Sequence, residues 1–340
     1  MTDTNQPVSN SFRAESLQIG PGAAAPIESV AVIGVGGVGG YFGGKLCQLR
    51  HNDSEFNISF VARGEHLRAI QSSGLLLSSE ADGELLCAPT LATDDFERLP
   101  PFDVGLLCVK EFDLTAVLTA LEPMIGETTI LLPLLNGVDV STRVRAMIKK
   151  GVVLPACVYV GTHIERPGKV VQKGGACKIL FGPDPRQPEF SPCEIITLFN
   201  RAKIKSEWTL NVHSEIWKKF IFIAAFGLVS AAHGKVLGEI LDDDELSTDA
   251  LAIMREAVAL AGARGVSLPN DAAEASFAKA KGFPYETKTS FQRDFERCDK
   301  PDERDLFAGT MLRMGERFRI HVPTIKAISE RLAMKKPLAS

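Results

Sequence analysis

The sequence predicts an α/β fold in two parts, an N-terminal parallel sheet covered by helices and a C-terminal part that is mostly α-helical. Short apolar strands alternate with helical segments up to about Glu207, and a glycine-rich turn joins the first strand to the first helix. Helical periodicity dominates from Leu210 onward. We therefore expect a flexible tail over 1–28, a sheet domain over 29–207 and a helical domain over 208–336.

The composition is that of an ordinary globular protein. The chain has 340 residues, 45% of them hydrophobic and 24% charged, with a formal net charge of -4. This length allows two hydrophobic cores. The weak acidity and the lack of a Lys/Arg cluster argue against nucleic-acid binding. The seven cysteines are scattered without a C-x-x-C pair, which indicates reduced thiols in a cytoplasmic protein and neither a disulfide framework nor a metal site.

The N-terminal residues lack the basic region and apolar stretch of a signal peptide. They are rich in Ser, Thr, Asn, Gly, Pro and Ala, which is the reason for the predicted tail. Elsewhere, the apolar run over 220–232 is shorter than the about 20 residues that a membrane span requires. The sequence therefore predicts a soluble protein without a membrane segment.

A glycine-rich turn follows the first strand, in the segment SVAVIGVGGVGGYFGGKL. Gly34 permits the tight turn, Gly36 lets the backbone approach a pyrophosphate, and Gly39 lets helix and strand pack closely. The N-terminus of the following helix offers free N–H groups to the phosphates. A glycine-rich turn can also be a plain turn, but the flanking strand and helix favour a Rossmann-like dinucleotide site. Its expected binding residues are Gly34, Gly36, Gly37, Val38 and Gly39.

The next strand, NISFVAR, ends at Arg63. This is about 20 residues beyond the glycines, where NAD-binding folds carry an Asp or Glu for the ribose hydroxyl. A carboxylate would repel a 2′-phosphate, whereas a guanidinium binds one in a fork geometry. Arg63 therefore predicts NADPH in preference to NADH. The alternative is a solvated surface arginine.

Two later strands end in polar residues, after a hairpin predicted over 75–86. The strand DVGLLCVK ends at Lys110, and TTILLPLL runs into Asn136 and a glycine. Ligands of open α/β sheets gather at the carboxyl ends of the strands, so both side chains are expected near the nicotinamide half of the cofactor. The alternatives are a strand-end charge facing water for Lys110 and an ordinary turn for Asn136. Further strands and a helix over 193–202 complete the first part.

The segment EIWKKFIFIAAFG places Lys218 and Lys219 at the start of an uncharged apolar run. Such a run predicts a helix enclosed by other helices. A lysine at its edge either reaches water or has its pKa lowered by desolvation until it exchanges protons near neutral pH. Further helices follow, with Ser247 as an expected cap and with Gly265 and Pro323 at helix ends. A cleft between the sheet and helical domains is the usual place for a cofactor to meet its substrate.

The order of these motifs resembles the ketopantoate reductases, which reduce 2-dehydropantoate (ketopantoate) to pantoate with NADPH in pantothenate and coenzyme A biosynthesis. The matching segments are GVGGVGGYFGGKL, VARGEHL, LLCVK, NG, IWKKF, KTSFQRD and DERDLFAG. They occur in the family's order and cover nearly the whole chain after the tail. The resemblance implies an NADP-dependent oxidoreductase that acts on a CH–OH group.

The resemblance also implies catalytic roles in the second half. Lys219 resembles the general acid that protonates the carbonyl oxygen as hydride arrives, and Lys218 its less critical neighbour. Glu303 resembles the carboxylate that binds substrate in the cleft, and Ser290 the hydroxyl that contacts the substrate carboxylate. An ammonium can stabilise and protonate the oxygen that becomes negative, and Glu303 would keep that lysine charged. The alternatives are a lysine that reaches water, a glutamate on a helix surface and a serine that caps a helix.

Three positions of the first half resemble cofactor-side residues of the same family. Asn136 and Lys110 correspond to cofactor-side and active-site contacts, with Asn136 also near the substrate. Arg63 corresponds to the residue on the 2′-phosphate, which agrees with the position of this arginine after its strand. The resemblance therefore adds to the prediction of NADPH.

The sequence departs from the family on the helix that carries the lysine. Ketopantoate reductases have asparagines one and two turns after it, where this chain has Ile223 and Gly227. A polar substrate group is costly to bury against apolar side chains, so the substrate is alternatively less polar or bulkier than ketopantoate. Ser230 or His233 could then supply a polar contact. Leu135 also replaces a residue that is usually polar.

Three hypotheses follow from the sequence. The first is reduction of ketopantoate by NADPH, and the second is a related oxidoreductase that acts on a different 2-oxo acid. The third is a nucleotide-binding protein without catalysis, for which the missing asparagines are the support. The expected partner is a small 2-oxo acid, and long helices that can pair are compatible with a homodimer.

Overall fold

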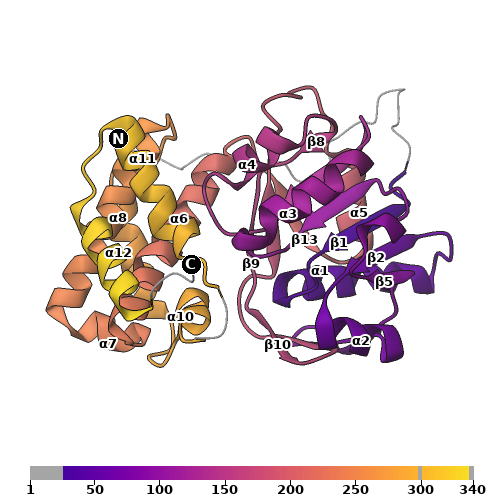
Figure 1. The fold of residues 1–340 in the computed structure, drawn as a ribbon, viewed down its shortest axis with the longest axis horizontal. Helices are drawn as coiled ribbons and strands as arrows, with labels where there is room; N and C mark the ends of the chain where they lie inside the picture. Colours follow the sequence, from indigo (N-terminus) through magenta and orange to yellow (C-terminus); the bar gives the residue numbers. More distant parts are fainter. Residues whose placement is uncertain (1–25, 298–300, 337–340) are drawn as a thin grey trace, which may run out of the picture.

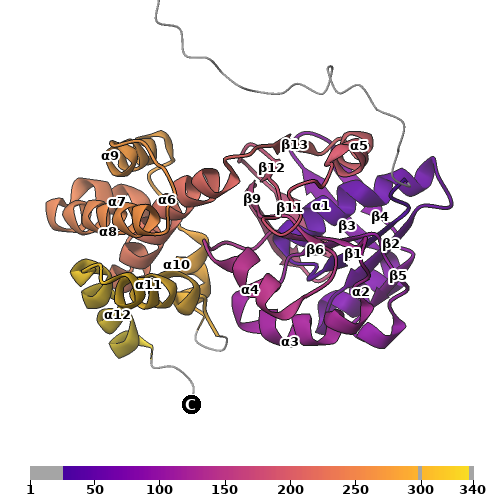
Figure 2. The same cartoon turned by 90° about the horizontal axis from the view of Figure 1, so that it is seen from above.

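The computed structural model describes residues 26–297 and 301–336 and shows two parts side by side (Figures 1 and 2). Sheets and their covering helices form the first part, up to Trp208, and helices form the second, from Val212. The predicted α/β class is confirmed. The predicted tail lies almost entirely outside the described residues, and Cys298 lies outside them too.

The centre of the first part is a six-stranded parallel sheet with the order β5-β2-β1-β6-β7-β8. The chain adds strands on one side of β1 and then, from β6 onward, on the other. The order reverses between β1 and β6, and ligands of such sheets bind at the loops beyond this point. The strands are β1 (Ser29–Ile33), β2 (Asn57–Val61), β5 (Leu91–Thr93), β6 (Val104–Leu107), β7 (Ile130–Pro133) and β8 (Val152–Val153).

Both faces of this sheet are buried. Ala31 and Ile33 of β1 belong to one hydrophobic cluster, whereas Val30 and Val32 belong to another on the opposite face. This alternation follows from the two-residue period of a strand, and burial on both faces explains why the strands are apolar throughout. The helices of this part are α1 (Gly37–Cys47), α2 (Gly64–Ser73), α3 (Glu111–Leu121), α4 (Val140–Met147) and α5 (Cys193–Arg201).

Two smaller sheets lie beside the large one, with the orders β10-β11-β3-β4 and β13-β12-β9. The predicted hairpin is the antiparallel pair β3–β4, and Gly83 has the positive φ, +71°, that its turn requires. The strands are β3 (Leu75–Ser79), β4 (Gly83–Cys87), β9 (Ala156–Tyr159), β10 (Thr162–Arg166), β11 (Lys169–Gln172), β12 (Lys178–Phe181) and β13 (Lys205–Trp208).

The second part is built around α6 (Val212–His233), whose apolar residues pack against the surrounding helices. Its side chains Trp217, Phe220 and Phe226 are fully buried, as the uncharged run predicts. Gly234 ends the helix in the left-handed conformation. The other helices are α7 (Leu237–Asp242), α8 (Asp244–Ala263), α9 (Ala272–Ala278), α10 (Ser290–Phe295), the π-helix η6 (Asp305–Gly309), α11 (Thr310–Phe318) and α12 (Pro323–Lys335).

The predicted cap of α8 is wrong. Asp243 is its N-cap, and the Asp243 carboxylate accepts hydrogen bonds from the backbone N–H groups of Glu245 and Leu246. Ser247 lies inside the helix, where its hydroxyl donates to the Ile240 carbonyl. The helix begins earlier than the periodicity indicates because the acidic residues before Ser247 form its first turn.

The apolar run lies within α6, which is longer than the run alone, so length does not by itself exclude a membrane span. Within the described residues, α6 is the one helix long and apolar enough to cross a membrane, because it begins at Val212. Its most apolar window has a mean hydropathy of 1.3, and 72% of that window is buried inside the molecule. A core helix meets the same criterion, so this finding is weak evidence for a span.

One hydrophobic cluster continues from the large sheet into the helical part. It includes Ile33 and Leu107 of the sheet, Phe220 of α6 and Ile325 of α12. The two parts therefore share buried apolar surface where they meet, and α6 lies at this junction.

Candidate active site

A small pocket, open to solvent, lies where the two parts meet. Its polar side chains are Lys219, from α6, and Asn136, from the loop after β7. The remaining lining is mainly apolar, a composition typical of ligand sites. The lining residues are Leu135, Asn136, Gly137, Cys157, Ile216, Lys219, Phe220 and Ile223.

Lys219 is held in this pocket by a hydrogen bond. Its Nζ donates to Asn136 Oδ1 at 2.7 Å and lies 5.9 Å from the centre of the Tyr159 ring. Burial lowers the pKa of Lys219, and Cys157 and Glu303 oppose this shift only in part, so the pKa lies below its ordinary value of 10.5. Lys219 thus matches the lysine that the sequence predicts to be desolvated.

The neighbouring Lys218 has a different environment. Its Nζ donates to Glu215 Oε1 at 2.7 Å, one turn earlier on α6, and both side chains are about one-third exposed. Adjacent residues point in different directions on a helix, so only one of the two lysines reaches the pocket.

Lys110 connects the two parts of the molecule. It stands directly before α3, and its Nζ donates to Asp294 Oδ2 of α10 at 2.6 Å and to Glu303 Oε2 at 2.7 Å. Burial lowers the pKa of Lys110, but the two carboxylates outweigh this and raise it above its ordinary value. The Lys110 side chain is also 45% exposed, so it faces water in part while it bonds to both carboxylates. The helix-surface alternative for Glu303 is wrong, because this residue is only 4% exposed.

Glu303 does not hydrogen-bond to Lys219, although the sequence suggests that it keeps this lysine charged. Its carboxylate bonds to Lys110 instead, and the pKa of Lys219 remains lowered. Glu303 acts on Lys219 through its charge alone, since Lys110 reaches the same carboxylate from the first part of the molecule.

Ser290 is the exposed first residue of α10, and Thr289 caps this helix by accepting from the Gln292 backbone N–H at 3.0 Å. The capping alternative for Ser290 therefore does not apply. Ser230 is 1% exposed, and its hydroxyl donates to the Gly227 carbonyl and lies 3.1 Å from Thr289 Oγ1. The structure thus places Ser230 in the contact between α6 and α10, outside the pocket lining.

Apolar packing occupies the two positions of α6 where the resemblance implies asparagines. Ile223 lines the pocket one turn after Lys219. At Gly227, a Cβ atom would lie 3.4 Å from Phe291 Cβ, so a longer side chain would meet this buried ring. His233 lies at the far end of α6, where its Nδ1 is 3.4 Å from the Arg331 guanidinium. None of these three residues supplies a polar group to the pocket lining.

The glycine turn after β1 has the geometry of a phosphate cradle. Gly34 has a φ of +97°, and a Cβ at Gly39 would collide with the Gly34 carbonyl oxygen. At Gly36, a Cβ would find no heavy atom of the described residues within 4 Å, which leaves room for a ligand. α1 begins with Gly37 and Val38 and has neither a side-chain cap nor an acidic residue in its first turn. Its N–H groups therefore remain available to an anion.

Arg63 stands between β2 and α2, at the same edge of the sheet. Its guanidinium donates to both oxygens of Asp113, on α3, at 3.2 and 2.6 Å, and its side chain is 73% exposed. It is exposed, as a surface arginine would be, but Asp113 holds it near the place where the strand order reverses, between β1 and β6.

Sequence reasoning missed two residues that shape this site. Asp294 bonds to Lys110, and its motif KTSFQRD contains the acidic residue without indicating a partner. Tyr159 lies beside Lys219 but comes from β9, whose sequence carries no sign of this contact. Both contacts depend on how the two parts pack.

Comparisons with known proteins agree with this arrangement. Residues 30–186 match the family "Ketopantoate reductase PanE/ApbA", and residues 211–336 match "Ketopantoate reductase PanE/ApbA C terminal". A 2-dehydropantoate 2-reductase from Mesorhizobium japonicum is 29% identical over 334 residues, which cover 91% of this chain and 97% of the relative.

Solved structures show the same fold. A PanE/ApbA family ketopantoate reductase from Ralstonia eutropha JMP134 superposes with a TM-score of 0.81 at 27% identity, over 90% of this chain and 97% of that one. A D-mandelate dehydrogenase, solved with NADH and anilino(oxo)acetate, has a TM-score of 0.78 at 17% identity, over 90% and 98% of the two chains. At this lower identity, the likeness concerns the fold alone.

Proposed function

The chain belongs to the ketopantoate reductase family of NADPH-dependent oxidoreductases, and we propose that it reduces a 2-oxo acid, with 2-dehydropantoate as the first candidate and pantoate as its product. The observation that carries this proposal is the bond of 2.7 Å between Lys219 and Asn136, in the pocket between the two parts. This bond holds the partly desolvated ammonium of Lys219 where the sheet part meets the helical part.

The glycine turn would hold the pyrophosphate of the cofactor, and Arg63 would bind its 2′-phosphate in place of Asp113. When bound, NADPH supplies the hydride that adds to the carbonyl carbon. Lys219 donates the proton at Nζ to the carbonyl oxygen, which becomes negative as the carbon is reduced. Asn136 accepts from the same ammonium and so fixes its direction.

Lys110 and Glu303 support this chemistry from outside the pocket lining. Their ion pair joins the two parts, and the charge of Glu303 opposes the loss of the Lys219 proton. Ser290, exposed at the start of α10, is a candidate donor to the substrate carboxylate. Ser230 would act indirectly, by holding the start of α10 against α6.

A second candidate substrate is a less polar 2-oxo acid. The observation that favours it is the apolar pair of positions on α6, with Ile223 in the pocket and the ring of Phe291 against Gly227. A site built to hydrogen-bond a substrate hydroxyl rejects an analogue without it by on the order of 10⁴-fold, whereas an apolar pocket discriminates on the order of 10²-fold or less.

Replacing Lys219 by Ala tests the catalytic assignment. We expect turnover with 2-dehydropantoate to fall by on the order of 10²-fold or more, because the proton donor is lost. NADPH affinity, measured by fluorescence titration, should remain near that of the parent. Lys218→Ala is the matched control and should keep most of the turnover, since Lys218 pairs with Glu215 away from the pocket. Unchanged turnover in Lys219→Ala would contradict the proposed function.

A pair of substrates separates the two candidates. Trimethylpyruvate is ketopantoate without its hydroxyl group, and kcat/KM for each is measured from the loss of NADPH absorbance. A preference for ketopantoate above on the order of 10³-fold would support ketopantoate as the substrate, whereas a ratio near one or a preference for trimethylpyruvate would support the less polar class. NADPH binding without turnover of any 2-oxo acid would instead support a non-catalytic protein.

A further inference from the structure

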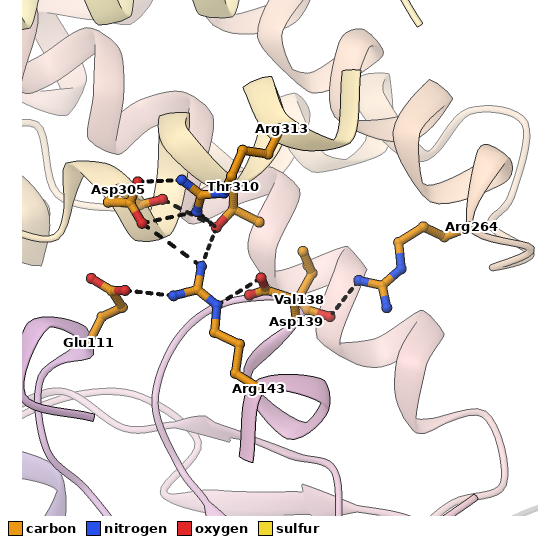
Figure 3. A network of polar contacts seen from close by, with 8 residues as sticks. All are labelled: Glu111, Val138, Asp139, Arg143, Arg264, Asp305, Thr310 and Arg313. Atoms are coloured by element: carbon orange, nitrogen blue, oxygen red, sulfur yellow. Dashed lines mark hydrogen bonds and ion pairs between the residues drawn. The ribbon is translucent and has the colours of Figure 1, made fainter. Parts of the chain in front are cut away.

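A cluster of charged side chains lies beside the active site, centred on Arg143 of α4 (Figure 3). The Arg143 Nε donates to Asp139 Oδ2 at 2.8 Å. Its two terminal nitrogens donate in different directions, to Glu111 Oε1 at 2.5 Å and to Thr310 Oγ1 at 2.8 Å. The planar fork of one guanidinium therefore serves three separate chain segments, a geometry that a lysine cannot reproduce.

Two of these partners lie next to active-site residues of the first part. Glu111 follows Lys110 directly and forms the first turn of α3. Asp139 comes three residues after Asn136, in the loop between β7 and α4. Arg143 thus fixes the backbone that carries both residues, although it does not itself line the pocket.

The third partner belongs to the helical part, just beyond Glu303. The Thr310 hydroxyl donates to the Asp305 carbonyl and accepts from Arg143 and Arg313, which uses its one donor and both acceptor positions. The Asp305 carboxylate lies 4.0 Å from Arg143 and is bound by both terminal nitrogens of Arg313. These residues form η6 and the start of α11, and π-helical turns occur frequently at functional sites.

The loop of Asn136 also packs directly on η6. A Cβ at Gly137 would lie 2.6 Å from Leu306 Cδ1, so only a glycine allows this close approach. On the other side of the loop, Arg264, the C-cap residue of α8, donates to the Val138 carbonyl at 3.3 Å. A few contacts therefore determine how this loop lies against η6. Among them, the hydrogen bonds of Arg143 are polar and also reach α3.

We propose that Arg143 is a positioning residue that holds Lys110, Asn136 and Glu303 in register across the junction of the two parts. This inference rests on the proposed function, because it assigns Arg143 a role in that reaction. Lys219 takes its direction from Asn136, and Lys110 is the partner of Glu303, so a shift of η6 against the loop disturbs both pairs. Misplacement by about 1 Å can reduce a rate by on the order of 10²-fold.

The test replaces Arg143 by Gln and by Lys in the full chain. We expect kcat to fall by roughly 10- to 100-fold in Arg143→Gln and by a smaller factor in Arg143→Lys, with the dissociation constant for NADPH changed by less than about 3-fold. In Arg143→Ala, guanidinium ions at millimolar concentration should restore part of kcat, while ammonium ions should not. Rescue by both ions, or by neither, would contradict the role of the guanidinium fork.

Two matched arginines serve as controls. Arg145 is on the same helix and is buried, but it bonds to Asp184 and the Gly151 carbonyl within the first part. Arg145→Gln should therefore lower the melting temperature and leave kcat near the parent value. Arg313 binds Asp305 and Thr310 but forms no hydrogen bond or ion pair with the first part among the described residues, so Arg313→Gln should affect kcat less than Arg143→Gln.

Hydrogen–deuterium exchange gives a readout that is independent of activity. Exchange over 134–139 and 303–311 should be faster in Arg143→Gln than in the parent, while 29–33, in β1, stays protected. If the parent reduces no 2-oxo acid but this exchange pattern is present, the proposed function fails and the positional role stands. If the parent is active and Arg143→Gln has the same kcat or the same exchange as the parent, the inference is overturned. If Arg143→Gln does not fold, the same measurements on Arg143→Lys provide the test.

Discussion

At the scale of single residues, the pKa of each lysine in the site depends on the partner that it contacts. Lys110 forms ion pairs with two carboxylates, those of Asp294 and Glu303, so its pKa is raised. Lys219 has an amide partner, Asn136, and no carboxylate at hydrogen-bond distance among the described residues, so burial dominates and its pKa is lowered. Two lysines in one site thus have opposite shifts, which suits one for an ion pair and the other for proton transfer.

Replacing Glu303 by Gln should change the pH dependence of the reaction. Lys219, as the proposed proton donor, has to be protonated, so activity is expected below its pKa and should be lost as pH rises through it. The Glu303 charge raises this pKa, so its removal should move the alkaline limb of the kcat/KM profile to lower pH, with a lower rate throughout. Asp294→Asn is the control, because Asp294 contacts Lys110 but does not contribute to the shift of Lys219. An alkaline limb that stays in place in Glu303→Gln would disprove this coupling.

At the scale of elements, the cofactor cradle is a local structure. The turn after β1 requires the positive φ of Gly34, and α1 packs closely because Gly39 has no side chain against the Gly34 carbonyl. Gly36 differs from both, since its missing side chain faces space left free by the described residues. Two of the three glycines therefore serve local packing, and we propose that the third, Gly36, faces the ligand.

Gly36→Ala should separate ligand binding from stability. The backbone of Gly36 is extended with a φ of -89°, so alanine fits and stability should be unchanged or raised by up to about 1 kcal/mol. NADPH affinity should fall by roughly 10-fold or more, which corresponds to about 1.4 kcal/mol. Thermal unfolding and fluorescence titration measure the two quantities. Gly39→Ala is the comparison and should lose both, and unchanged NADPH affinity in Gly36→Ala would place the phosphates elsewhere.

At the scale of the whole molecule, the two parts are joined by apolar and polar contacts. The shared hydrophobic cluster runs from the sheet through α6, and ion pairs bridge the junction from Lys110 and from Arg143. Figure 3 shows the ion pair of Arg143 with Asp305. The pocket therefore exists only when both parts are folded and in contact, since each supplies one of its polar side chains.

We expect the two parts to unfold in one cooperative transition. Tryptophan fluorescence, from Trp208 in β13 and Trp217 in α6, should follow the same curve as circular dichroism, which is dominated by the helices. NADPH at 100 times its dissociation constant should stabilise this transition by about 2.7 kcal/mol, although its cradle is in the sheet part. Two separate transitions, with only the first raised by NADPH, would show that the parts are energetically independent.

The sequence by itself determined the local features of this protein. These features depend on residues that lie close together in the chain, where spacing and hydrophobic period indicate the structure. They are the glycine turn, the strands that end before Arg63, Lys110 and Asn136, and the burial of α6. The cap of α8 was missed at this same scale, because several acidic residues before Ser247 can each begin a helix.

The tertiary structure alone decided which of these features form the site. Asn136 and Lys219 are 83 residues apart in the chain, Lys110 and Glu303 are 193 apart, and Arg143 and Thr310 are 167 apart. These contacts depend on the rotation of α6 about its axis and on how the helical part docks on the sheet, which local spacing does not encode. The contact of Lys219 with Asn136, the partner of Glu303 and the contacts of Arg143 across the junction follow from that docking.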